Sequence, residues 1–244
     1  MGTARSLLRP TFLTVVLSGF AFVAFASAAD RMTQRDPTWS RLVPTPFRAE
    51  AAQISATLAF ADSDVRRAGS EAARAVTASP ADAQAIGLLA TAMLLSDDAE
   101  RTERAFGLAG TLGWRDPVGQ TYWLNARLQQ GEARAAIDRF EAIVRGNPSF
   151  PATDRLLGAL MADSEARGLL IKRMGRQPYF ARQLLAVDAL ALSAAVAQRA
   201  DLLLDPGFEE QPLGCTIVEP MIEGLASRQM TGRARAVQEQ HCPV

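Results

Sequence analysis

The stretch that decides the fold is VGQTYWLNARLQQGEARAAIDRFEAIVRGNP, residues 118–148. Gly131 falls between two segments of helical apolar spacing, so it is expected to form the turn between two helices. In the second segment a small, an aromatic and an aliphatic residue follow one another as Ala136, Phe140 and Ile143. Pro148 then ends the segment, because proline cannot continue a helix. The pattern predicts a helical hairpin whose helices cross closely at Ala136.

Prolines recur at a similar distance along the preceding chain. Pro80, Pro117 and Pro148 are separated by 37 and 31 residues, which bracket the period of about 34 residues of tetratricopeptide repeats. Together with the small, aromatic, aliphatic and proline order of residues 118–148, this spacing resembles a tetratricopeptide repeat. The resemblance covers residues 48–148, and it implies stacked helix pairs with a concave, peptide-binding face.

The resemblance divides the chain into three units, residues 48–80, 81–117 and 118–148. The first unit carries the pattern mostly in alanines, as Ala56, Ala68, Ala72, Ala75 and Pro80. The second unit matches through Ala105, Ala109, Leu112 and Pro117, with a few extra residues between its helices. The predicted fold is all-α, a membrane-targeting helix followed by a tetratricopeptide-like helical-hairpin solenoid. The alternative is an ordinary helical bundle with accidental proline spacing.

The N-terminal segment, residues 1–29, is predicted to target a membrane. Arg5 and Arg9 precede an uncharged run from Pro10 to Ala29, which is about as long as the hydrocarbon core in helical rise. Ala26-Ser27-Ala28 also has the small-x-small form of a signal peptidase site. The segment is therefore either a single-pass anchor in a bacterial inner membrane or a signal cleaved near Ala28 that releases a periplasmic or secreted protein. Both interpretations keep the arginines inside, and residues 30–47 form a linker.

The C-terminal part is predicted as further degenerate helix pairs over 149–204 and an irregular tail over 205–244. The segment DPGFEEQPLGC, residues 205–215, resembles a junction in membrane-anchored tetratricopeptide proteins associated with bacterial exopolysaccharide loci. In those proteins the junction opens a β-domain that looks like a carbohydrate-binding module. Too few residues follow Gly214 for such a domain, and Cys215 replaces the usual tryptophan. Cys215 and Cys242 are either a disulfide or two free thiols.

Composition excludes several kinds of function. The chain has 26 basic and 26 acidic residues, so there is no electrostatic case for nucleic acid. No Walker, GxSxG or HExxH motif is present, and the single histidine, His241, lies near the end of the tail. We therefore expect no catalytic residues, no cofactor and no metal site. Asp62 and Asp64, the best carboxylate pair, are expected to cap helices at a turn.

The sequence therefore predicts a non-enzymatic scaffold that binds a protein or peptide in its concave face, and the resemblance implies a place in polysaccharide or envelope assembly. Candidate contact residues come from the first helix of each pair: Gln84, Gln120, Asn125 and Arg127. One alternative is a glycan-binding accessory protein that stacks sugars on aromatic residues, Trp114, Tyr122, Trp123 and Phe208. The other is an envelope enzyme with an unrecognised site at Asp62 and Asp64.

Overall fold

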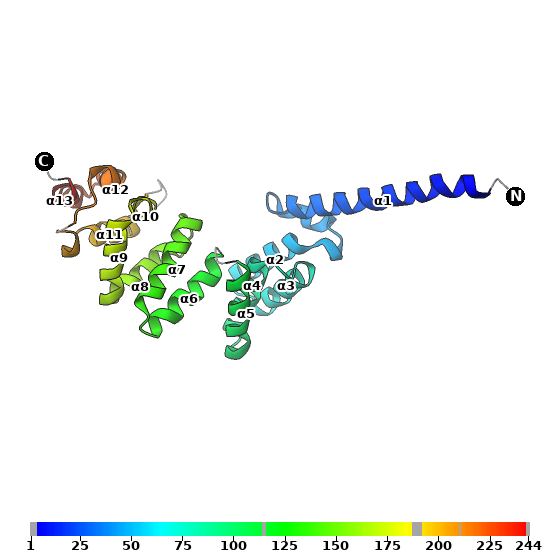
Figure 1. The fold of residues 1–244 in the computed structure, drawn as a ribbon, viewed down its shortest axis with the longest axis horizontal. Coiled ribbons are helices and arrows are strands. Elements are labelled where there is room, and N and C mark those ends of the chain that lie inside the picture. Colours follow the sequence, from blue (N-terminus) through cyan, green and yellow to red (C-terminus); the bar gives the residue numbers. More distant parts are fainter. Residues whose placement is uncertain (1–3, 114–115, 187–191, 210, 243–244) are drawn as a thin grey trace. The chain divides into compact units, whose positions relative to one another are not determined.

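The computed structural model describes residues 4–113, 116–186, 192–209 and 211–242. These residues form thirteen α-helices and three short 3-10 helices, and no strand occurs among them (Figure 1). The predicted all-α class is therefore confirmed. The helices fall into two compact units, residues 1–113 and residues 114–244. The array predicted over residues 48–148 is thus divided between two units after its second helix pair.

The first unit opens with the helix that carries the apolar segment, α1 (Ala4–Met32). Figure 1 shows its N-terminal part extending beyond the other helices of this unit. Its stretch Phe12–Met32 is long and apolar enough to cross a membrane. Every side chain from Phe12 to Phe25 is exposed, whereas Ala26 and Ala29 are buried. The predicted linker then forms two 3-10 helices that contact α1, η1 (Pro37–Leu42) and η2 (Thr45–Phe47).

Helical hairpins follow, and three of them share one internal register. Their first helices are α2 (Ala49–Ala61), α4 (Ala83–Leu95) and α6 (Pro117–Gln129). Their second helices are α3 (Val65–Ala78), α5 (Ala99–Leu112) and α7 (Ala133–Gly146). The start and the end of each helix advance by the same interval from one hairpin to the next. Within the first unit α3 packs against both α2 and α4, so two hairpins stack side by side.

The hairpin turns repeat in the same way. Each turn has one residue in the left-handed region, Ser63 (φ 59°), Asp97 (φ 60°) or Gly131 (φ 72°). The next backbone N–H donates to a carbonyl earlier in the first helix, as from Asp64 to Ala59 at 2.8 Å, and the later turns repeat this bond. This bond is the Schellman closure, which satisfies carbonyls that the helix end leaves without partners. The same local device therefore ends the first helix of all three hairpins.

Burial follows the register as well. Six positions of each hairpin are buried in all three copies. Grouped by position, the buried residues are Ala51, Ala85 and Gly119; Ala52, Ile86 and Gln120; Ala56, Ala90 and Leu124; Ala68, Thr102 and Ala136; Ala72, Phe106 and Phe140; and Ala75, Ala109 and Ile143. Alanine lets the helices of the first hairpin approach closely, because its side chain occupies little volume. The third hairpin has larger side chains, Leu124, Phe140 and Ile143, at three of these positions.

This register corrects the predicted alignment of the middle unit. The counterparts of Ala136 and Phe140 are Thr102 and Phe106, so no extra residues lie between α4 and α5. Pro117 does not end the middle unit but opens α6. Proline is tolerated there, because the first backbone N–H groups of a helix have no partner within the helix.

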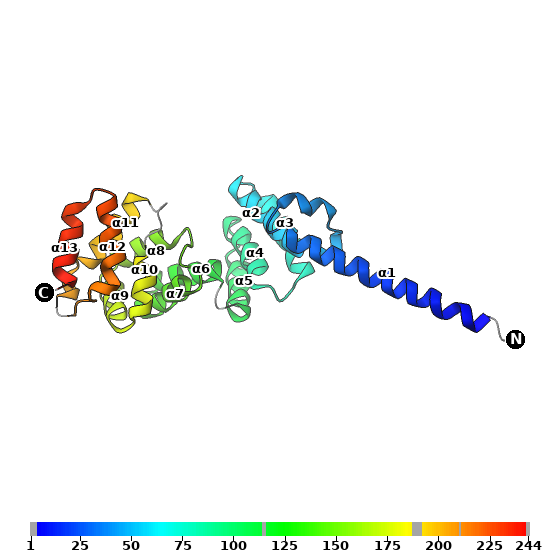
Figure 2. The ribbon, with the colours of Figure 1, turned by 90° about the horizontal axis from the view of Figure 1, so that it is seen from above.

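The second unit continues with helices around a single apolar core. After α7 come α8 (Thr153–Ala162), α9 (Ser164–Arg176), α10 (Pro178–Leu185), α11 (Ser193–Leu203), η3 (Pro206–Phe208), α12 (Cys215–Ser227) and α13 (Thr231–His241). Figures 1 and 2 show α12 and α13 lying side by side, and they contact each other extensively. Their turn places Gln229 at φ 61° and repeats the closing bond of the earlier hairpins, from Met230 N to Leu225 O at 2.9 Å.

The tail predicted as irregular is therefore helical. Its apolar residues belong to the core of the second unit, and the buried ones are Phe208, Ile217, Val218, Met221, Leu225, Ala234 and Val237. Asp205 accepts a hydrogen bond from Gly207 N at 2.8 Å and caps the short helix η3. Helix α12 follows where the resemblance implied the start of a β-domain. The association with exopolysaccharide loci remains a prediction.

Candidate functional site

The four predicted contact residues are divided between the two units, and one of them is buried. Gln84 is exposed in the first turn of α4, in the first unit, and the other three lie on α6 in the second unit. Gln120 is only 1% exposed, and its side-chain oxygen accepts a hydrogen bond from Arg139 at 3.2 Å. Its predicted exposure was wrong. Asn125 is exposed, and its amide donates to Thr121 O at 2.9 Å.

Arg127 is engaged within its own hairpin. Its Nη1 lies 2.8 Å from Glu132 Oε2 and 3.1 Å from Gln130 Oε1. Its guanidinium also lies over the ring of Trp123, 5.7 Å from the ring centre. These contacts tie the end of α6 to the turn before α7. Arg127 thus has a structural role that its position in the sequence did not reveal.

The aromatic residues proposed for glycan stacking are not displayed together either. Tyr122 and Trp123 are half-buried and meet edge to face, with ring centres 5.2 Å apart. Phe208 is buried, and its ring packs against the imidazole of His241. Trp114 lies outside the described residues. The buried ring of Phe208 cannot stack on a sugar, so that part of the prediction was wrong.

The carboxylate pair considered for an enzyme lies at a hairpin turn. Asp62 is the C-terminal cap of α2, and Asp64 is the N-terminal cap of α3, where its Oδ1 accepts from Arg67 N at 3.0 Å. Both side chains are exposed. Asp98 caps α5 in the corresponding way, accepting from Arg101 N at 3.2 Å. Capping accounts for Asp64 and Asp98 without any catalytic role.

A different acidic residue joins the apolar helix to the first hairpin. Asp30 is buried near the end of α1. Its Oδ2 accepts from Glu50 N and its Oδ1 from Ala51 N, both at 3.0 Å, so it caps α2 from outside the hairpin. In the second hairpin Asp82 provides this cap locally, to the corresponding N–H groups of α4. The counterpart of Asp82 in the first hairpin is Arg48, which makes no cap.

Basic side chains surround this junction. A pocket of about 250 Å³ is lined by Thr45, Arg48, Ala52, Glu71 and Arg74. Arg74 is compensated there, because its Nη1 lies 2.6 Å from Glu71 Oε1. Arg48 has no ion-pair partner within the described part of the chain. The pocket therefore offers one uncompensated guanidinium and a hydroxyl, groups that suit a small anion.

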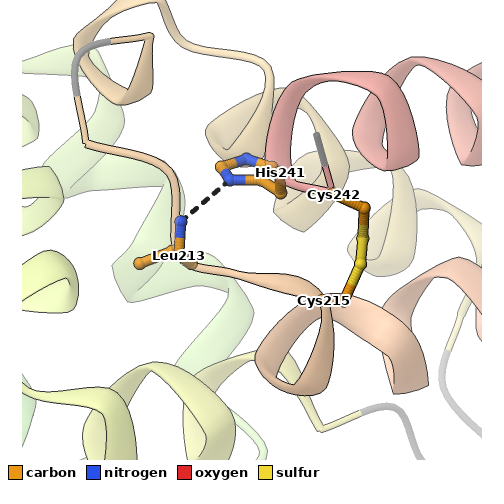
Figure 3. Close-up of a disulfide and its surroundings, with 4 residues drawn as sticks. All are labelled: Leu213, Cys215, His241 and Cys242. Atoms are coloured by element: carbon orange, nitrogen blue, oxygen red, sulfur yellow. Dashed lines mark hydrogen bonds between the residues drawn. A yellow bond between two sulfur atoms is a disulfide. The ribbon is translucent and has the colours of Figure 1, made fainter. Parts of the chain in front are cut away.

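The C-terminal hairpin is fixed by two features that Figure 3 shows together. Cys215, the first residue of α12, and Cys242, which follows α13, form a disulfide that joins the two ends of the hairpin. His241 is fully buried, its Nδ1 accepts from Leu213 N at 3.2 Å, and its Nε2 lies 2.8 Å from Leu203 O. These partners define a neutral ring with its proton on Nε2. Burial lowers the pKa of His241. The hydrogen bond to Leu203 raises this pKa, but its effect is smaller than that of burial.

No protein-family model matches the chain, and no curated protein matches its sequence. What the chain does must therefore be inferred from its own fold and side chains. Among the residues that the structure describes, no three His, Cys, Asp or Glu side chains gather as metal ligands would. The most distinctive arrangement is the junction of α1 with the first hairpin. The sequence held a signal for it, the arginine at the capping position of the first repeat.

Proposed function

We propose that this chain is a membrane-anchored tetratricopeptide-repeat protein that works by binding a partner protein on the far side of a bacterial cytoplasmic membrane. The observation that carries the proposal is the constant spacing of helix ends, turns and buried positions across three hairpins. That spacing equals the tetratricopeptide period of about 34 residues. Arrays of such hairpins expose long helical surfaces that bind other proteins, and the proposal is binding without catalysis.

We further propose that α1 stays attached as an anchor with its N-terminus inside. The helix continues without a break past Ala28 to Met32, and Ala26 and Ala29 are buried against the first unit. Asp30 caps α2, so the end of the apolar helix is part of the folded domain. Arg5 and Arg9 before the apolar run favour an inside N-terminus.

The disulfide supports the same orientation. Disulfides persist in compartments such as the bacterial periplasm and are rare in the cytosol. The Cys215–Cys242 bond closes a hairpin of the second unit, on the C-terminal side of the apolar helix. A chain whose N-terminus is inside and which crosses the membrane once places both cysteines in the periplasm.

Exposed leucines mark a surface for the partner on the first unit. Leu58 lies in the last turn of α2, and Leu94 and Leu95 end α4; each is about half exposed. The two helices contact each other and run in the same direction, because each is followed by a short turn and an antiparallel helix. The leucines therefore lie toward the same end of the two stacked hairpins. Gln84 is exposed at the opposite end of α4.

Photocrosslinking in living cells tests this surface. A photoreactive residue would replace Leu94 or Gln84, with Arg66 and Arg67 on α3 as control positions that are also exposed. The proposal predicts one envelope protein, identified by mass spectrometry, captured from the α4 positions and not from the controls. Equal capture at all four positions, or none at any of them, would contradict it.

The anchor has a separate test. Alkaline extraction of membranes should leave the full-length chain in the pellet, and intact mass analysis should find residues 1–28 still present. A soluble chain that begins at Ala29 would show that the segment is a cleaved signal.

A further inference from the structure

The segment after α1 folds back along the apolar helix. We call η1, η2 and the flanking arginines, residues 31–48, the juxtamembrane collar. Its Phe47 meets Phe22 of α1 edge to face, with ring centres 6.2 Å apart. Phe22 precedes Asp30 by about two helical turns, or about 12 Å along a helix axis. The collar therefore reaches from the end of α1 back toward the middle of its apolar segment.

Helix length places the collar at the membrane surface. The uncharged part of α1 that precedes the buried Ala26, residues 10–25, rises about 24 Å, but the hydrocarbon core is about 30 Å thick. The rest of the hydrocarbon thickness has to be spanned by the C-terminal end of α1 together with the segment that packs against it. The collar contacts α1. If α1 spans the bilayer, the collar lies at its outer surface, with Phe47 reaching below the headgroup layer toward Phe22.

The apolar side chains of the collar fit that position. Leu42 is 58% exposed, and Trp39 is half-buried close to it in the chain. Tryptophan is enriched where membrane and water meet, because its ring is apolar and its N–H is polar. The exposed part of Leu42 would have no apolar contact in water, and the headgroup layer supplies one.

The positive and the negative side chains of the collar differ in their partners. Its arginines, Arg31, Arg35, Arg41 and Arg48, make no ion pair with any residue in the described ranges. The three carboxylates of residues 30–50 are instead bound to neutral donors. Asp30 caps α2, Asp36 accepts from Thr38 N at 2.9 Å, and Glu50 accepts from Gln34 at 2.7 Å. Four guanidinium groups are thus left for an external anion.

The repeat register shows where the collar departs from the rest of the array. At the capping position, the second and third hairpins have Asp82 and Asp116, and the first has Arg48. The cap that Arg48 cannot provide comes from Asp30 on α1. The charge at this position is therefore reversed only in the hairpin next to the apolar helix, and Arg48 also lines the small pocket with Thr45.

We infer that the juxtamembrane collar binds the phosphates of anionic phospholipids in the outer leaflet and so holds the first hairpin against the membrane. The inference rests on the proposed anchoring of α1. Guanidinium groups match phosphate oxygens in geometry as well as in charge. Each arginine close to an anionic surface is expected to favour the docked state about fivefold.

Depth-dependent fluorescence quenching tests the inference on the full-length chain. The variant W114F/W123F keeps Trp39 as its only tryptophan, and W39F/W114F keeps Trp123 in the second unit. Each is reconstituted into vesicles of phosphatidylcholine, with or without phosphatidylglycerol, that carry bromine either near the headgroup or near the chain end. Both leaflets have the same composition, so mixed orientation does not affect the result. Flotation of the vesicles reports anchoring by α1.

The collar predicts that Trp39 is quenched most by bromine near the headgroup and that phosphatidylglycerol increases the quenching. Adding R35Q/R41Q should lower the equilibrium constant for docking of the collar to phosphatidylglycerol-containing vesicles about 25-fold. The matched pair R66Q/R67Q, which removes two exposed arginines from α3, should leave it unchanged. If the chain floats but Trp39 is quenched no more than Trp123, or if both arginine pairs act alike, the collar inference is overturned and the anchor stands. A chain that does not float overturns both.

Discussion

Replacing Asp30 by alanine should loosen the first hairpin at the end that adjoins α1. The change removes both acceptors for Glu50 N and Ala51 N, which are part-buried or buried. Loss of a helix cap costs about 0.5–2 kcal/mol of stability. The cost lies in the upper part of this range when the loss leaves a buried N–H donor without a partner. We therefore expect a loss of about 1–2 kcal/mol in the local stability of α2. Opening of the first turns of α2 should become about 5- to 30-fold more frequent.

The repeat register offers a rescue for this variant. Arg48 occupies the position from which Asp82 caps α4 in the next hairpin. Arg48→Asp in the Asp30→Ala background should restore a local cap, and a carboxylate there also interacts favourably with the N-terminus of α2. We expect the double variant to regain most of the lost stability of α2. The attachment of α2 to α1 would still be missing.

Hydrogen exchange with mass spectrometry, on the full-length chain in detergent micelles, measures both effects. Amides in peptides from residues 49–61 report the opening of α2. Asp98→Ala is the matched control, because it removes the cap of α5 and should accelerate exchange there but not in α2. Two results would refute the assignment of Asp30 as the cap of α2. One is that the α2 amides of Asp30→Ala exchange within a factor of about two of their rate in the unmodified chain. The other is that Arg48→Asp does not slow their exchange again.

Three further predictions concern the second unit, each measured by circular dichroism in detergent. Serine at both Cys215 and Cys242 removes a link between residues 27 apart and should lower the free energy of unfolding by about 3.5 kcal/mol; reduction of the unmodified chain should reproduce this loss. Because burial lowers the pKa of His241, the unfolded chain binds the proton more readily, so stability should fall as the pH drops below about 6.5. His241→Gln should abolish that fall between about pH 7 and 5, where no other side chain of ordinary pKa titrates, and an unchanged slope would contradict the role of the ring. Phe140→Ala empties a buried site beside Phe180 and should cost about 3–5 kcal/mol; a loss no larger than that of the exposed Tyr179→Ala would contradict the packing.

The helical class and the hairpins could be predicted because they depend on local signals. Gly131 takes the left-handed conformation expected of a turn glycine, and Ala136 and Phe140 are buried as their spacing indicated. The prolines were a poorer guide to the period. Pro80 and Pro148 occupy one position two periods apart, but Pro117 lies in the first turn of a helix. Turn residues such as Ser63 and Asp97 mark the period better, although their side chains carry no strong signal for a left-handed backbone.

The parts that could not be predicted depend on contacts between distant segments. Gln120 looks like any polar surface residue until Arg139, 19 positions away, pairs with it in a buried interface. His241 was expected in a loose tail, but it reaches Leu203 across 38 positions because α12 and α13 pack on the core. The cap from Asp30 to α2 likewise joins positions that lie 20 and 21 apart in the chain. Periodicity along one segment contains no information on such partners.

The cap at Asp30 also sets the rotational orientation of the apolar helix α1 relative to the first hairpin. Asp30 faces the α2 amides only because α1 presents it at that angle around its axis. One residue inserted or deleted between Phe25 and Asp30 would turn the carboxylate by about 100° and move it about 1.5 Å along the axis. A rotation of α1 about its axis would therefore turn the first hairpin with it, and if α1 spans a bilayer, a rotation within the bilayer would reach the domain in this way.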